Sequence, residues 1–134
     1  MPLKDGTPED YQAAALRHYQ DASALRDAGR LDNAGHLIGF SAECAIKYRI
    51  ESLGSGDRSP AQHLPDILVA ARKRLGERSN FTSMYNLLKS DIFADWAVDH
   101  RYSSTGKTTS EQFEAWVHIT RRLLAAANIR ARSA

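Results

Sequence analysis

The side chains best suited to chemistry are concentrated in one polar stretch, HRYSSTGKTTSEQ, at residues 100–112. The stretch leads into a predicted helix, and the amides and partial positive charge at a helix N-terminus favour a bound anion. The pattern therefore predicts a phosphate- or nucleotide-binding site formed by Arg101, Ser103, Ser104, Lys107 and Thr108. The alternative interpretation is a solvent-exposed linker rich in small polar residues.

The same stretch also contains side chains that could cleave RNA. Cleavage without a metal needs a proton acceptor near the 2′-hydroxyl and a cation that stabilises the charge developing on the phosphate. The candidate catalytic residues are Arg101, His100 and Tyr102. Arg101 would hold the phosphate, His100 or His36 would transfer protons, and Tyr102 would stack on a base or donate a hydrogen bond.

A long helix is predicted from residue 31 or 32 to about residue 53, and it contains GHLIGFSAECAIKYRI at residues 35–50. Apolar or small residues cover most of its circumference, which predicts a central position in the fold. Gly35 and Gly39 are four residues apart, so another helix backbone is expected to approach closely there. Cys44 has apolar neighbours and is expected in the core.

Three polar residues of this helix, His36, Glu43 and Lys47, share one strip of its surface and are candidates to support the site. An exposed Glu43–Lys47 ion pair is the simpler alternative. Metal binding is not expected, because the chain has no Glu-x-x-His spacing and no cysteine cluster. No cofactor is predicted.

Apolar spacing and start signals predict further helices at about residues 8–28, 60–75 and 81–96, with Thr7 as the first N-cap. Thr108 and Glu111 have capping-box spacing and predict a last helix through about residue 129. No strand pattern is found. The expected fold is all-α, an up-and-down bundle of four to five helices in a single domain at residues 1–134, with its core at about 8–130 and frayed ends.

Charge and hydropathy limit the classes of function. The net charge is only +2, but residues 1–67 have a net charge of −3 and residues 68–134 a net charge of +5, so an anionic partner is expected at the second half. No apolar run is long enough to span a bilayer, and the first ten residues have no hydrophobic signal core. A cytoplasmic protein without membrane contact is expected.

Three segments together resemble a known family: GHLIGFSAECAIKYRI, then QHLPDIL at residues 62–68, then DWAVDHRYS at residues 95–103 before a final helix. The chain resembles the HEPN (higher eukaryotes and prokaryotes nucleotide-binding) domains over about residues 11–129. The resemblance implies a homodimeric helical bundle, often encoded beside a nucleotidyltransferase-type partner or within toxin–antitoxin and phage-defence systems. Active members are metal-independent RNases.

The family's catalytic signature is an arginine followed by a histidine after four to six intervening residues. Arg101 lies in the corresponding region, but residues 102–108 contain no histidine. The resemblance therefore implies a nucleotide- or RNA-binding protein with weak or no nuclease activity. The alternatives are an active RNase that uses Arg101 with a rearranged histidine, and a structural partner protein without a ligand.

Overall fold

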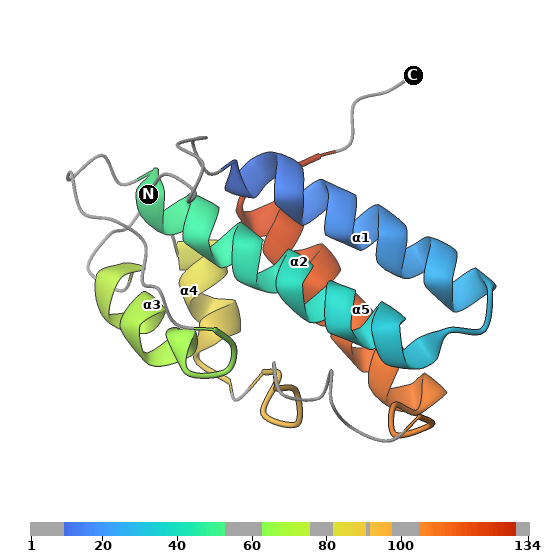
Figure 1. Ribbon diagram of the computed structural model, residues 1–134. Coiled ribbons are helices and arrows are strands. Elements are labelled where there is room, and N and C mark those ends of the chain that lie inside the picture. The colour runs from blue at the N-terminus through green and yellow to red at the C-terminus, as the bar shows by residue number, and fades with distance from the viewer. Residues whose placement is uncertain (1–9, 53–62, 76–81, 91, 98–104, 131–134) are drawn as a thin grey trace, which may run out of the picture.

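The computed structural model describes residues 10–52, 63–75, 82–90, 92–97 and 105–130. Within these ranges the chain forms helices and no strands (Figure 1). The helices are α1 (Tyr11–Asp27), α2 (Leu31–Glu51), α3 (Ile67–Leu75), α4 (Thr82–Leu88) and α5 (Ser110–Ala126). The prediction of an all-α bundle is confirmed. No helix in the described ranges combines the length and apolarity that a bilayer crossing requires.

The predicted central helix is confirmed as α2, which packs against α1, α3 and α5. A tight turn at Gly29, whose φ is +78°, joins α1 to α2, and the two helices lie side by side as a hairpin (Figure 1). Small residues face each other where the helices touch, since Ala15, Ala22, Ala34 and Ala42 are all fully buried. The hydroxyl of Ser41 donates a 2.6 Å hydrogen bond to the Ala15 carbonyl across this contact.

Helices α2 and α5 run in the same direction. Gly35 lies against Thr108 and Trp116 at the start of α5, while the Ile38 carbonyl accepts a 3.5 Å hydrogen bond from the Thr120 hydroxyl, further along that helix. The N-termini of both helices therefore lie at the same end of the bundle, as Figure 1 shows. This parallel arrangement determines where the candidate site forms.

The two glycines of α2 accommodate indole rings rather than another helix backbone. A Cβ at Gly39 would lie 2.1 Å from Cε2 of Trp96, and one at Gly35 would lie 2.8 Å from Cζ3 of Trp116. The expected close approach at these positions is present, but the predicted partner was wrong. The flat indole rings fill the space left by the absent glycine side chains, so this face of α2 is packed as closely as a protein interior.

The N-terminal caps of α1 and α5 differ from the predicted ones. Helix α1 begins at Tyr11, and its N-cap is Asp10, whose carboxylate accepts a 2.9 Å hydrogen bond from the Ala13 amide. The predicted cap, Thr7, lies outside the described residues. Helix α5 has its capping box at Thr109 and Gln112, one residue after the predicted pair. Thr108 is not available as the cap because it is bound elsewhere, as described below.

The two short helices are shorter than predicted. Helix α3 begins at Ile67 rather than near residue 60, two residues after Pro65, which has no amide hydrogen to donate. Helix α4 ends at Leu88 rather than near residue 96, and Phe93, with a φ of +59°, has a left-handed backbone that no α-helix continues. Cys44, expected in the core, is only partly buried and packs against it.

Candidate functional site

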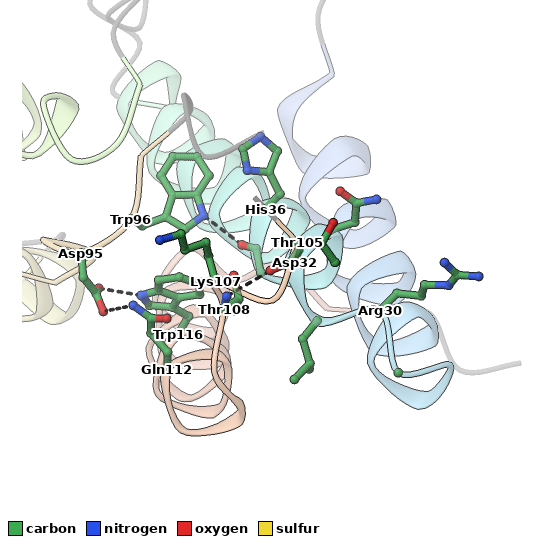
Figure 2. A pocket seen from close by; sticks show the side chains of 14 residues that line it. Arg30, Asp32, His36, Asp95, Trp96, Thr105, Lys107, Thr108, Gln112 and Trp116 are labelled. Atoms are coloured by element: carbon green, nitrogen blue, oxygen red, sulfur yellow. Dashed lines mark hydrogen bonds between the residues drawn. The ribbon is translucent and has the colours of Figure 1, made fainter. Parts of the chain in front are cut away.

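A hollow of about 680 Å³ lies at the end of the bundle where α2 and α5 begin (Figure 2). Its lining combines the first turn of α2, the loop before α5, the first turns of α5 and two residues of the segment 92–97. These pieces are distant in the sequence. The parallel packing of α2 and α5 brings them together.

The loop before α5 is attached to the first turn of α2 by Asp32. One carboxylate oxygen accepts a 2.7 Å hydrogen bond from the Gly106 amide and the other a 3.0 Å bond from the Thr108 amide. These hydrogen bonds lower the pKa of Asp32 below its ordinary value, because they stabilise the ionised form. Gly106 permits the turn with a φ of +93°. A carboxylate of the chain itself thus occupies two of the amides that a phosphate could have used.

A second carboxylate, that of Asp95, connects the segment 92–97 to α5. It accepts a 2.9 Å hydrogen bond from Nε2 of Gln112 and another of 2.9 Å from Nε1 of Trp116 (Figure 2). The neighbouring Trp96 donates from its indole nitrogen to the Gly35 carbonyl at 2.9 Å. Both indoles are almost fully buried, so they form walls of the hollow and not open stacking surfaces.

The hollow has a positive electrostatic bias that comes from the backbone. The formal charges of Arg30 and Lys107 cancel those of Asp32 and Asp95, which are already hydrogen bonded. The positive ends of two helix dipoles remain. Arg30 stands at the N-cap position of α2 without a side-chain cap hydrogen bond, so the first-turn amides of α2 are not served by a capping side chain.

The two cations contribute differently to the hollow. Lys107 is exposed, and Figure 2 shows its side chain extending toward Trp96 and Asp95. Arg30 lies on the opposite side of the view and extends away from those residues. Lys107 is therefore the better placed of the two to meet an anion inside the hollow.

The structure places three of the predicted site residues, Lys107, Thr108 and His36, in the lining of this hollow. His36 is half-buried, and its ring stacks on Trp96 with ring centroids 5.6 Å apart. The other predicted residues of the stretch lie outside the described residues: Arg101, His100, Tyr102, Ser103 and Ser104. Trp96 and Thr105, which flank that segment in the sequence, both line the hollow.

Glu43 and Lys47, expected beside the site or as an exposed ion pair, form a buried pair instead. Their side chains are 6% and 9% exposed, and Lys47 Nζ lies 3.1 Å from a Glu43 carboxylate oxygen. Glu43 also accepts a 3.0 Å hydrogen bond from the Leu64 amide and lies 3.0 Å from Nδ1 of His63. The exposed-pair interpretation was wrong because residues 63–64 cover this face of α2.

No metal centre is found among the residues that the structure describes, where no three His, Cys, Asp or Glu side chains are grouped to hold an ion. Asp32/His36 and Glu114/His118 have the i, i+4 spacing of helical metal ligands, but their carboxylates have other contacts. Asp32 accepts the loop amides, and Glu114 lies 3.7 Å from Arg26 on the surface.

Sequence reasoning missed Asp95, Gln112 and Trp116 as components of the site. Gln112 had a usable signal, since it stands three residues after Thr109, the spacing of a capping box. Asp95 had no such signal in the sequence, because its partners on α5 lie 17 and 21 residues away in the chain.

Searches of known protein families, of curated proteins and of solved structures give no match to this chain. The resemblance to HEPN domains therefore depends on the three sequence segments alone and stays a prediction.

Proposed function

We propose that this protein binds a nucleotide or the phosphate backbone of RNA, with the phosphate held in the hollow between the starts of α2 and α5. The observation that carries the proposal is the convergence of two parallel helix N-termini, one of them without a side-chain cap, on a hollow that also contains Lys107. Backbone amides and a helix dipole stabilise an anion even where side-chain charges cancel.

The balance of side-chain charges favours a small anion over an extended polyanion in the hollow itself. Two carboxylates in the lining would repel a run of phosphates, whereas one phosphate can lie beside Lys107 and the first turn of α2. The hydroxyl of Thr105, also in the lining, is a further hydrogen-bond donor for its oxygens. Arg101 stays the predicted additional cation for a longer RNA.

The wider context belongs to the same proposal. A HEPN-like homodimer in the cytoplasm, acting with a nucleotidyltransferase-type partner in a toxin–antitoxin or defence system, is consistent with a protein that binds nucleotides and cleaves RNA weakly or not at all. Support for this context comes from the sequence resemblance and from the all-α bundle.

The test is calorimetric titration of the full chain with AMP and with a short single-stranded RNA in EDTA. Lys107→Ala and Arg101→Ala should weaken RNA binding and reduce the slope of log K against log salt by about 0.7 each, as expected for the loss of one phosphate contact on a single strand. Lys89→Ala, an exposed lysine on another part of the bundle, is the matched control. Unchanged affinity in Lys107→Ala would refute the proposal.

A second candidate function, metal-independent RNA cleavage, is favoured by one observation: His36 lines the same hollow as Lys107. An imidazole beside a bound phosphate can transfer the proton of a 2′-hydroxyl. RNA should then be degraded in EDTA, and both Arg101→Ala and His36→Gln should abolish the degradation. A full rate in either variant excludes that residue, and intact RNA in the wild type excludes cleavage. A chain that neither binds nor cleaves RNA would instead be a structural partner protein.

A further inference from the structure

Five aromatic rings from four segments of the chain, counting that of Phe40 itself, meet at Phe40 of α2. The Phe40 ring centroid lies 5.1 Å from that of His36, 5.5 Å from Trp96, 6.1 Å from His18 and 6.4 Å from His63. We call these five residues the ring cluster. A core needs only apolar volume at such a position, so three imidazoles around one phenyl ring add polar edges that packing alone does not require.

His63 is the open side of the ring cluster. Its side chain is 50% exposed, while the Glu43 carboxylate that contacts its Nδ1 at 3.0 Å is buried. A carboxylate accepts hydrogen bonds and does not donate them, so the neutral form of His63 has its proton on Nδ1. In that tautomer Nε2, on the other side of the ring, is an acceptor. Glu43 thereby fixes both the orientation of the ring and its hydrogen-bonding role.

The ring cluster is continuous with the hollow. His36 and Trp96 belong to both, and Phe40 lies between His36 and His63. A molecule with its charged end in the hollow would therefore lie next to the cluster. The half-exposed ring that its far end would meet is that of His63.

We propose that the ring cluster is the base-binding half of the nucleotide site, in which a nucleobase stacks on His63 and donates a hydrogen bond from an exocyclic amine to His63 Nε2. This inference rests on the proposed function, because it assumes that the phosphate is bound in the hollow. Stacking on a half-exposed ring is how proteins hold bases of single-stranded nucleic acids without reading a long sequence. The acceptor nitrogen favours adenine and cytosine, which present amines, over uracil.

Titrations of the full chain with AMP, UMP and ribose 5-phosphate test the proposal. AMP should bind about 5- to 150-fold more tightly than ribose 5-phosphate, the range that one stacked base contributes, and more tightly than UMP. His63→Gln keeps a donor for Glu43 but removes the ring, and Phe40→Leu removes the ring behind it while keeping apolar volume. Both variants should bind AMP about as weakly as ribose 5-phosphate. His118→Gln, an exposed histidine of α5 outside the cluster, should behave as the wild type.

The outcomes separate this inference from the function it builds on. If ribose 5-phosphate and AMP bind equally well, or if His63→Gln retains the full preference for AMP, the phosphate site exists and the base-binding inference is wrong. If neither compound binds the wild type, the proposed function itself has failed. Thermal unfolding of each variant identifies any loss of affinity that comes from loss of the fold. If Phe40→Leu is unfolded, the affinity of His63→Gln for AMP decides the test.

Discussion

The indole of Trp96 occupies the space where a side chain at Gly39 would have to be, with Cε2 only 2.1 Å from the position of a Cβ. The same indole donates to the Gly35 carbonyl one turn earlier. One glycine therefore makes room for the ring, and the carbonyl of the other orients it. These contacts attach segment 92–97 to α2, and they hold the Trp96 ring in place as one wall of the hollow.

Gly39→Ala should destabilise the protein by about 2 kcal/mol, the usual cost of forcing an extra group into a packed core. The cost arises because the buried Trp96 ring must move, and the better helix propensity of alanine recovers only about 1 kcal/mol. Urea unfolding followed by tryptophan fluorescence measures both effects, since a displaced Trp96 should also emit at longer wavelength.

Gly35→Ala provides the graded comparison, because a Cβ there would meet Cζ3 of Trp116 at the longer distance of 2.8 Å. It should cost less than Gly39→Ala. An alanine at Gly39 that leaves stability and fluorescence unchanged would contradict the account of this wall.

The buried pair of Glu43 and Lys47 should be strongly coupled. Glu43→Leu leaves the Lys47 ammonium buried without its carboxylate and should cost about 3–5 kcal/mol. Lys47→Met should cost less, because Glu43 keeps its contacts with His63 and the Leu64 amide. The double variant should cost less than the two single changes together, because no unpaired charge remains. Denaturant unfolding of all four proteins gives the coupling energy.

Arg26 and Glu114 form the matched surface pair, 3.7 Å apart with side chains 34% and 60% exposed. Their coupling should be below about 1 kcal/mol, since solvent screens the charges. Equal coupling in the two pairs would show that burial of Glu43 has no energetic consequence.

Stability should depend on pH through Asp32. Amide hydrogen bonds from Gly106 and Thr108 hold its pKa in the folded chain below the ordinary value of 3.8. The ionised group therefore contributes its full stabilisation above about pH 4, and the contribution is lost as the pH falls through the lower folded pKa. Asp32→Asn should be less stable than the wild type at pH 7, and the difference should shrink toward pH 2. A difference that stays constant or grows on acidification would be inconsistent with this assignment.

Much of the fold was predictable from local patterns. The apolar circumference of residues 31–53 identified α2 as central, and the glycine after residue 28 correctly ended α1, because both signals are read from neighbouring residues. Errors occurred where a distant group decided the outcome. Asp32 takes the amide of Thr108 and moves the cap of α5 to Thr109, and no feature near Thr108 in the sequence indicates that contact.

Some residues that line the hollow were predictable from the sequence, and others were not. A polar, hydroxyl-rich loop before a helix pointed to Lys107 and Thr108, which do line the hollow. The role of Glu43 could not be read from its i, i+4 spacing with Lys47, because that spacing is the same for exposed and buried pairs. Burial depends on His63 and Leu64, which lie 20 and 21 residues further along the chain.

The most direct test of the central claim is an NMR titration of the ¹⁵N-labelled protein with AMP. Binding in the hollow predicts the largest amide shifts at residues 31–33 of α2 and at Lys107, with smaller shifts at Phe40 and His63. Saturable shifts confined to the surface of α3 and α4, or no shifts at millimolar AMP, would contradict the claim that two helix N-termini and Lys107 form a nucleotide site.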